Sequence, residues 1–388
     1  MDAIMPSTQA RQQLVRSVKT IVVKIGTNVL ADEKGSLNGR RVRNLAGQIA
    51  RLHRRGLRVT VVSSGAIGAG VGVMGLPRRP RDLPMLQASA SVGQPVLMRF
   101  FDEGFRRHGL HAAQMLLTRS DFEHRVRYLN IRNTIAALHQ LSAIPIINEN
   151  DTVAVDEIRY GDNDIIAALT SNLIRADLLV ILSVVDGLIG SDGQRIDAVR
   201  RIDSEVAALA HSHRSSWGSG GMASKLQAIR RVTEAGDYAV IADGRSKDVL
   251  LRLLGGEKVG TLFMPAANKV SARKRWIGWT VQPRGTIVVD DGAARAMRRG
   301  GKSLLAIGIS AVEGHFQHGD VVRVRDSTGL EFARGLSNYS SAELNRIKGL
   351  RSSQFASVLG DKTYDEVIHR DNLVITVPGQ PAVSESSI

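Results

Sequence analysis

The alternation of short aliphatic runs with helical patterns limits the fold of this chain more than any other feature of its sequence. Six runs rich in Val, Ile and Leu have the length of β-strands, and segments with helical periodicity separate most of them. Runs that are apolar on both faces are typical of a mostly parallel sheet with helices on both sides. The sequence therefore predicts an α/β fold whose mostly parallel sheet is sandwiched by helices. The expected strands are Thr20–Ile25, Leu57–Ser64, His111–Leu117, Ile144–Ile147, Leu178–Ser183 and Tyr238–Ala242, and the expected helices are Arg41–Arg55, Leu86–His108, Arg125–Leu141, Ile165–Arg175 and Lys225–Ala235.

A break in this pattern near residues 265–283 divides the chain. The segment before it, residues 17–270, is the expected α/β domain. After it come short β-type runs separated by turns, which predict a small β-rich domain at residues 283–365. Residues 1–16 and 377–388 are expected to be disordered tails. The β-type runs are Gly285–Val289, Ser303–Ile307, Gly319–Val324 and Glu331–Gly335.

The composition excludes several classes of protein. The chain has 388 residues and no cysteine, which excludes disulfides and thiolate metal sites and suits a cytoplasmic protein. No segment approaches the ~18 uninterrupted apolar residues of a transmembrane helix, so we expect no membrane span. The net charge of +15 would suit nucleic-acid binding, but residues 271–388 hold only 16 basic residues against 12 acidic ones. Because the charge is not concentrated in the small domain, we do not expect the chain to bind RNA.

A glycine-rich turn leads directly into a helical pattern at residues 218–225 and carries Lys225 near the helix start. Free N–H groups at a helix start attract phosphate, and glycines let the backbone approach it closely. A second lysine, Lys24, lies near the end of the first strand. On its own it would be read as an exposed terminal lysine. Together, two lysines and a glycine turn are what a phosphoryl-transfer site without a Walker loop needs.

Two further turns follow predicted strands. Ser64 and Gly65 follow the second strand and open a glycine-rich helix, so they could hold a carboxylate or a phosphoryl oxygen, or simply form a tight turn for close packing. The turn at residues 183–187 follows the fifth strand. It could carry a nucleotide base or be an ordinary turn.

An acidic cluster, unexpected in so basic a chain, falls within residues 148–164. The sequence Asn-Glu-Asn-Asp ends the fourth strand at Asp151, and Gly-Asp-Asn-Asp begins a helix at residues 161–164. Such a cluster can bind an amino group, help to hold Mg²⁺ with phosphate oxygens, or orient the two lysines. A solvated acidic loop capped by Asp162 is the simpler alternative.

In their order along residues 18–370, these segments resemble the amino acid kinase family, and within it the kinases that act on glutamate. The Asn-Glu-Asn-Asp and Gly-Asp-Asn-Asp pair distinguishes those members from the kinases for acetylglutamate, aspartate, carbamate and UMP. The C-terminal part resembles a PUA domain. The stretches that carry the resemblance are residues 22–27, 63–70, 114–119, 146–151, 161–164, 220–222 with Lys225, and 273–277.

The resemblance implies an ATP-dependent phosphorylation of the γ-carboxylate of L-glutamate. The product would be glutamyl 5-phosphate, in the first step of proline biosynthesis. ATP would be accompanied by Mg²⁺, proline would be a feedback inhibitor, and the chain would form a homo-oligomer, either a dimer or a tetramer.

The resemblance also implies roles for single residues. Lys24 and Lys225 would stabilise the transferring group, and Asp164 and Asp162 would orient these lysines. No protein side chain is implied as a metal ligand. The residues implied to hold glutamate are Ser64, Gly65, Asp151 and Asn163, and those implied to contact ATP are Lys24, Ser183, Val184, Ser219, Gly220, Gly221, Met222, Ala223, Ser224 and Lys225.

The chain departs from the family pattern on the nucleotide side. Val184, Ile189 and Ala223 replace an aspartate, a tyrosine and a hydroxyl residue, and residues 190–193 lack an Asp-Pro pair. These departures concern ATP affinity and the contacts of the base more than glutamate recognition. Two alternative functions stay open. One is an RNA-binding regulator with a degenerate kinase domain, and the other is a kinase acting on a different carboxylate.

Overall fold

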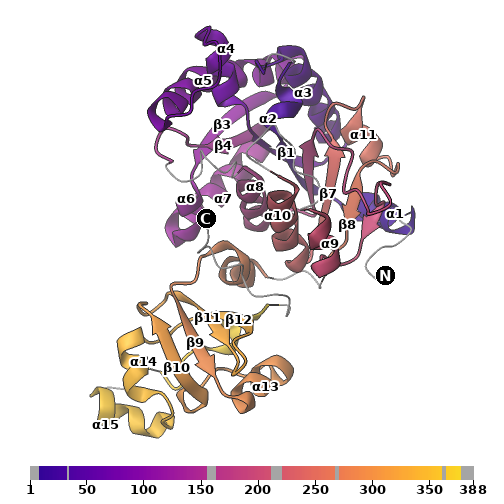
Figure 1. Cartoon of the computed structure of the whole chain (residues 1–388). Helices are drawn as coiled ribbons and strands as arrows, with labels where there is room; N and C mark the ends of the chain where they lie inside the picture. The colour runs from indigo at the N-terminus through magenta and orange to yellow at the C-terminus, as the bar shows by residue number, and fades with distance from the viewer. Residues whose placement is uncertain are drawn as a thin grey trace. The chain divides into compact units, whose positions relative to one another are not determined.

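A computed structural model of the chain describes residues 8–32, 35–154, 163–210, 221–266, 271–360 and 364–376. Contacts divide the chain into two compact units, Met1–Lys269 and Val270–Ile388. Each unit has its own sheet (Figure 1).

The first unit is built around a sheet with the strand order β3-β4-β2-β1-β5-β7-β8-β6. All neighbouring strands in it run parallel except the antiparallel pair β7 and β8. Every residue of β1 is buried, as expected for a central strand covered on both faces. The prediction of a mostly parallel sheet is confirmed. The strands are β1 (Thr20–Ile25), β2 (Arg58–Ser63), β3 (His111–Leu117), β4 (Ala143–Glu149), β5 (Leu178–Ser183), β6 (Ala198–Val199), β7 (Tyr238–Asp243) and β8 (Thr261–Phe263).

Helices cover both faces of this sheet (Figure 1). Ile21, Val23 and Ile25 of β1 belong to the core that includes residues of α3 and α5. Successive side chains of a strand alternate between the faces, so Val22 and Lys24 belong to the opposite face, where α8 contacts β1 and packs on α10. The helices are α1 (Thr8–Ser17), α2 (Thr27–Leu30), α3 (Gly39–Arg54), α4 (Ala66–Val73), α5 (Leu83–Arg106), α6 (Arg119–Glu123), α7 (Arg125–Gln140), α8 (Asn163–Ile174), α9 (Ser204–Leu209), α10 (Met222–Glu234) and α11 (Val249–Leu253).

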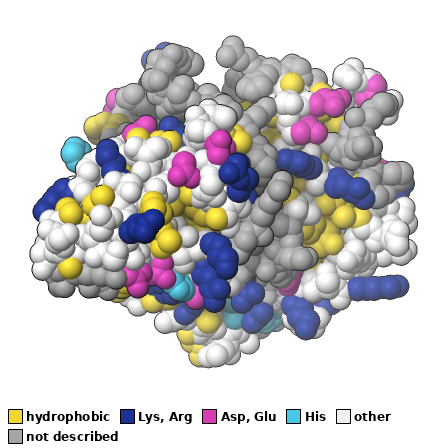
Figure 2. Space-filling view, turned by 90° about the horizontal axis from the view of Figure 1, so that it is seen from below, with side chains coloured by type: hydrophobic (Ala, Val, Ile, Leu, Met, Phe, Trp, Pro, Cys, Tyr) yellow, Lys and Arg dark blue, Asp and Glu magenta, His cyan; other side chains and the backbone are white. Residues whose placement is uncertain are grey.

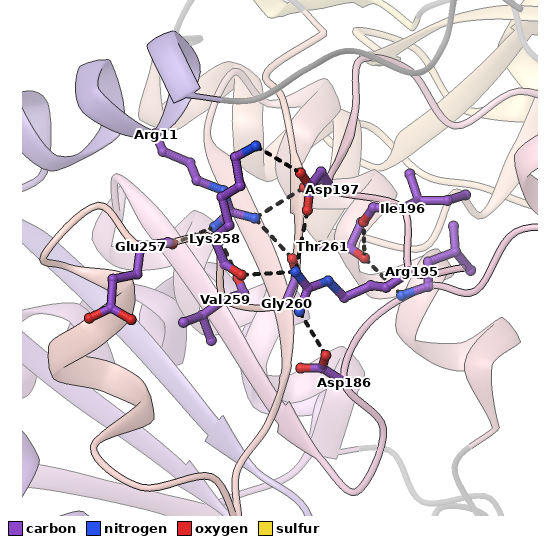
Figure 3. A network of polar contacts seen from close by, with 11 residues as sticks. Arg11, Asp186, Arg195, Ile196, Asp197, Glu257, Lys258, Val259, Gly260 and Thr261 are labelled. Atoms are coloured by element: carbon purple, nitrogen blue, oxygen red, sulfur yellow. Dashed lines mark hydrogen bonds and ion pairs between the residues drawn. The ribbon is translucent and has the colours of Figure 1, made fainter. Parts of the chain in front are cut away.

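The N-terminal segment corrects one expectation. Residues 1–16 were expected to be a disordered tail, but residues 8–16 belong to helix α1. Arg11 is only 2% exposed, and its guanidinium group donates hydrogen bonds to the backbone oxygens of Asp197, Val259 and Gly260 (Figure 3). Leu14 adds an apolar anchor. A guanidinium group has five N–H donors that need acceptors when the group is buried. Carbonyl oxygens at the sheet edge accept these hydrogen bonds and so offset the cost of burying Arg11. The other expected tail, residues 377–388, lies outside the described residues.

The second unit has a five-stranded sheet in the order β10-β9-β11-β12-β13, with a separate apolar core. One β-type run was assigned wrongly: Ser303–Ile307 is not a strand, and β10 begins only at Ile309. Leu304 forms an isolated bridge, and a short 3₁₀ turn follows at Ala306–Gly308. The elements are α12 (Ala272–Arg275), a π-helical turn (Trp276–Thr280), β9 (Gly285–Val289), α13 (Asp291–Gly300), β10 (Ile309–Gly314), β11 (Val321–Arg325), β12 (Glu331–Leu336), α14 (Ser341–Ile347), 3₁₀ turns at Ser352–Gln354 and Arg370–Asn372, α15 (Phe355–Leu359) and β13 (Leu373–Ile375).

Charged side chains of both signs share the surface. Figure 2 shows lysine and arginine side chains in several separate places on one face, interspersed with acidic and apolar ones. None of the helices in the described part of the chain has the length and apolar character needed to cross a bilayer.

Candidate active site

Three charged side chains from distant parts of the chain meet at the carboxyl end of β1. Nζ of Lys24 lies 2.7 Å from Oδ1 of Asp164, and Nζ of Lys225 lies 3.3 Å from Oδ2 of the same carboxylate. The hydroxyl of Ser224 donates to Oδ2 as well, at 3.1 Å. Lys24 and Lys225 are each 6% exposed, and Asp164 is fully buried. The structure therefore joins the two predicted lysines through one of the predicted carboxylates.

Local structure explains how these three residues meet. The alternation of β1 puts Lys24 on the face covered by α8 and α10. Asp164 lies in the first turn of α8, and Lys225 lies in the first turns of α10. Because both helices begin at the carboxyl edge of the sheet and pack on each other, their starts bring the carboxylate and the second ammonium group beside Lys24.

Burial and neighbouring charges shift the pKa values of Asp164 and Lys225. Burial alone would raise the pKa of Asp164, but the two lysine ammonium groups outweigh it and hold this pKa below its usual range. Burial lowers the pKa of Lys225; Lys24 lowers it further, and Asp164 opposes the shift. The cluster therefore brings two lysine side chains to one ionised carboxylate in a buried position. Ammonium groups held in this way can contact the negative charge of a phosphoryl group.

The start of α10 offers a second feature for an anion. Gly221 is the N-cap residue, with no side-chain hydrogen bond to the helix, and a Cβ at this position would meet nothing within 4 Å. Backbone N–H groups in the first turn of a helix attract phosphate oxygens. Met222 and Ala223 belong to this first turn, whereas the predicted Ser219 and Gly220 lie outside the described residues.

The start of α4 lies beside the carboxyl end of β1, because β2 pairs with β1. The backbone N–H of Ser64 donates to the carbonyl of Ile25 at 3.1 Å, and Gly65 has a φ of 108°. This left-handed conformation favours glycine. Further along α4, a Cβ at Gly70 would lie 1.8 Å from the carbonyl oxygen of Ser89 on α5. The glycines of this region therefore serve close packing as well as the turn that presents Ser64.

A relay of amide side chains leads to Asn163. Nδ2 of Asn163 donates to Oδ1 of Asn148 at 3.2 Å, Asn148 donates to Gln94 at 2.9 Å, and Gln94 donates to Gln114 at 3.1 Å. Oδ1 of Asn163 is buried and has no hydrogen-bond partner among the described residues. Sequence reasoning missed Gln94 and Gln114. A glutamine among the largely apolar residues of β3 was the available signal for Gln114, whereas the polar residues spread along α5 gave none for Gln94.

The remaining predicted residues either follow strands at the carboxyl edge of the first sheet or lie outside the described residues. Asp151 is in the turn that follows β4. Ser183 ends β5 and Val184 follows it, between β1 and β7. Asp162 lies outside the described residues. Within the described ranges, no three histidine or acidic side chains gather as they would around a metal ion.

Comparison with known proteins matches both units. The amino acid kinase family model matches residues 19–243, and the PUA domain model matches residues 285–359. A glutamate 5-kinase of Citrifermentans bemidjiense is 46% identical over 94% of this chain and 100% of its own length. Those of Caldanaerobacter subterraneus (46% identity; 93% of this chain, 98% of the relative) and Thermosynechococcus vestitus (48%; 92% and 100%) are also similar. Among solved structures, a carbamate kinase from Giardia lamblia bound to AMP-PNP matches with a TM-score of 0.44 and 20% identity, over 64% of this chain and 99% of that one.

Proposed function

The chain belongs to the amino acid kinase family, and within it to the glutamate 5-kinases, and we propose that Lys24, Asp164 and Lys225 form its phosphoryl-transfer centre. The enzyme transfers the γ-phosphoryl group of ATP to the γ-carboxylate of glutamate, in proline biosynthesis. One observation carries the assignment of the centre: two lysines from distant parts of the chain share one buried carboxylate at the carboxyl end of β1.

The chemistry needs positioned positive charge rather than a general base. An oxygen of the γ-carboxylate attacks the γ-phosphorus, the bond from this phosphorus to the β,γ-bridging oxygen breaks, and ADP leaves with the electron pair. The attacking carboxylate already carries its negative charge, so no proton has to be removed. The obstacle is repulsion between two anions, which fixed ammonium groups relieve. Lys24 and Lys225 are held for this task by Asp164.

Glutamate is proposed to bind on the β2 and β4 side of the lysines. The hydroxyl of Ser64 and the backbone N–H of Gly65 are proposed to donate to a carboxylate group of the substrate, since the N–H of Ser64 already donates to Ile25. Asp151 and Oδ1 of Asn163 accept from the substrate ammonium group. The amide relay supports this role, because it commits the Nδ2 donor of Asn163 to Asn148 and leaves Oδ1 as the acceptor.

ATP is proposed to bind on the β5 and α10 side, with its phosphates at Met222–Lys225 and Lys24 and its base near Ser183 and Val184. By resemblance to the family motif, Ser219 and Gly220 are also proposed to contact the phosphates of ATP. Both oxygens of Asp164 are engaged by lysines, so Mg²⁺ is proposed to enter with ATP, held by phosphate oxygens and water. We also propose a homo-oligomer, either a dimer or a tetramer, and inhibition by proline.

Glutamate-dependent release of ADP by the purified chain tests the function. We expect turnover with L-glutamate and much less with aspartate, acetylglutamate or carbamate. Turnover that prefers another carboxylate would place the chain among the sister kinases. Retention of RNA at moderate salt without ADP release would favour the alternative function of an RNA-binding regulator.

The glutamate side can be tested by substitution. Asp151→Asn and Asn163→Ala are each expected to raise KM for glutamate by roughly 10- to 100-fold, since each loses a charge-assisted contact with the ammonium group worth about 1.5–3 kcal/mol. KM for ATP should stay near its original value. Steady-state kinetics with each substrate varied in turn provide the measurement. A selective rise in KM for ATP would assign the acidic cluster to the nucleotide.

The second unit can be tested by truncation. A fragment ending within residues 264–274 is expected to fold and to retain glutamate kinase activity, because the proposed site residues all lie in the first unit, which has its own core. Circular dichroism and ADP release are the two measurements. A folded but inactive fragment would show that the PUA unit contributes to the site or to an assembly that the site needs.

A further inference from the structure

Arg245 holds the turn that follows β5. Its Nη2 donates to the carbonyl oxygen of Val184 at 2.9 Å. The side chain of Asp243 fixes the guanidinium group, with Nε 3.1 Å from Oδ1 and Nη2 3.3 Å from Oδ2. In addition, the backbone N–H of Gly244 donates to the carbonyl of Ser183 at 2.9 Å. The start of this turn is therefore tied to the end of β7 by one backbone and one side-chain hydrogen bond.

Arg195 holds the same turn two residues further on (Figure 3). Its Nη1 lies 2.7 Å from Oδ2 of Asp186, while its Nη2 lies 3.3 Å from Oδ1 of Asp197 and donates to the carbonyl of Lys258 at 2.9 Å. The hydroxyl of Thr261 accepts from the N–H of Leu188 at 2.8 Å. These contacts connect the turn to the residues before β6 and to strand β8.

Further hydrogen bonds hold the backbone behind Arg195. Arg11 of helix α1 donates to the carbonyl oxygens of Asp197, Val259 and Gly260, so the backbone that carries the partners of Arg195 is itself fixed (Figure 3). Arg195 is partly buried, with a side chain 24% exposed. Two planar guanidinium groups with several partners each are well suited to hold a backbone in one conformation.

We propose that Arg245 and Arg195 are positioning residues that hold residues 183–188 in the conformation that binds ATP. The proposal rests on the assignment of Ser183 and Val184 to the nucleotide side in the proposed function. Arg245 binds a backbone carbonyl at the start of this segment, and Arg195 binds the carboxylate of Asp186 further along it, so the segment is held at two points.

The test is steady-state kinetics of the full-length chain with ATP or glutamate varied. Arg245→Ala and Arg195→Ala are each expected to raise KM for ATP roughly three- to fivefold, an effect limited by the 46% and 24% exposure of the two side chains, with kcat and KM for glutamate within about twofold of the original. Arg245→Lys should recover part of the loss. Asp186→Asn should reproduce part of the effect of Arg195→Ala, because it removes the charge of the same ion pair but leaves the contacts of Arg195 with Asp197 and Lys258 in place.

Arg58→Ala is the matched control. Nε and Nη2 of Arg58 lie 3.1 and 2.9 Å from Oγ1 of Thr20, at the amino end of the same sheet. KM for ATP should not change in this variant. The proposal is overturned if KM for ATP is unchanged in the Arg245 and Arg195 variants, or if kcat and KM for glutamate change as much as KM for ATP. If an alanine variant does not fold, Arg245→Lys and Asp186→Asn decide between the same outcomes. Absence of glutamate-dependent turnover in the unmodified chain would instead refute the proposed function.

Discussion

Replacing Lys225 with alanine is expected to lower kcat by roughly 100- to 1,000-fold while the fold survives, because one preorganised electrostatic contact to the transferring group is worth about 3–4 kcal/mol. Lys24→Ala is expected to act similarly. Each variant leaves Asp164 paired with the other lysine, so no buried carboxylate is left without a counter-charge. KM for either substrate should change much less than kcat.

Single-turnover and steady-state rates of ADP formation measure this effect. Lys258→Ala is the control: it removes another lysine from an aspartate, since Nζ of Lys258 lies 3.5 Å from Oδ2 of Asp197, but that lysine is 56% exposed. The control should retain its kcat, because an exposed pair is worth about 0–1 kcal/mol. A change confined to KM in the Lys225 and Lys24 variants, with kcat intact, would contradict their catalytic role.

Asp164→Asn is expected to destabilise the first unit by about 3–5 kcal/mol and to abolish most of the activity. The substitution removes the negative charge shared by two buried ammonium groups, which then repel each other, and breaking a buried ion pair on one side has a cost of this size. Urea unfolding followed by circular dichroism gives the free energy of unfolding, and ADP release gives the activity.

A double variant separates charge from packing. Asp164→Asn with Lys225→Met removes one buried cation as well, so it should recover part of the lost stability without recovering activity. Glu103→Gln is the surface control, because Glu103 pairs with Arg43 at 2.9 Å where both side chains are substantially exposed. If Asp164→Asn were as stable as the original chain, the shared carboxylate would not be what stabilises the two buried lysines.

The long elements of the first unit could be predicted because each carries a complete local signal. Strand β1 is a continuous aliphatic run, and α3 has a clear apolar stripe. Helix α1 gave no such signal, since its burial depends on Arg11 and on carbonyl groups about 190–250 residues away in the sequence. In the second unit, Leu304 and Ala306 are buried and Leu305 and Ile307 are exposed. Buried and exposed residues alternate here as they do in a strand, although these residues are not part of a β-strand.

The candidate site was predictable only in part. The lysines and the acidic cluster were visible because charged residues follow apolar strands or open helices. Their mutual arrangement needs the strand order, which no local pattern contains. The glutamines of the amide relay were missed for a related reason. Gln94 lies in the middle of α5, and its part in the site becomes visible only through its hydrogen bond with Asn148 of β4.

The close contact of α4 with α5 has a consequence for how the chain tolerates mutation. A Cβ at Gly93 would lie 1.9 Å from the carbonyl oxygen of Ala66, as close an approach as that of Gly70 to Ser89. Any larger residue at either position must push the two backbones apart and displace the turn at Ser64. A mutational scan scored by activity would therefore mark both glycines as essential although neither is assigned to a ligand. The glycines at positions 70, 72 and 75 have the spacing of a nucleotide-binding motif. The first of them, Gly70, stands where the packing of α4 on α5 requires glycine.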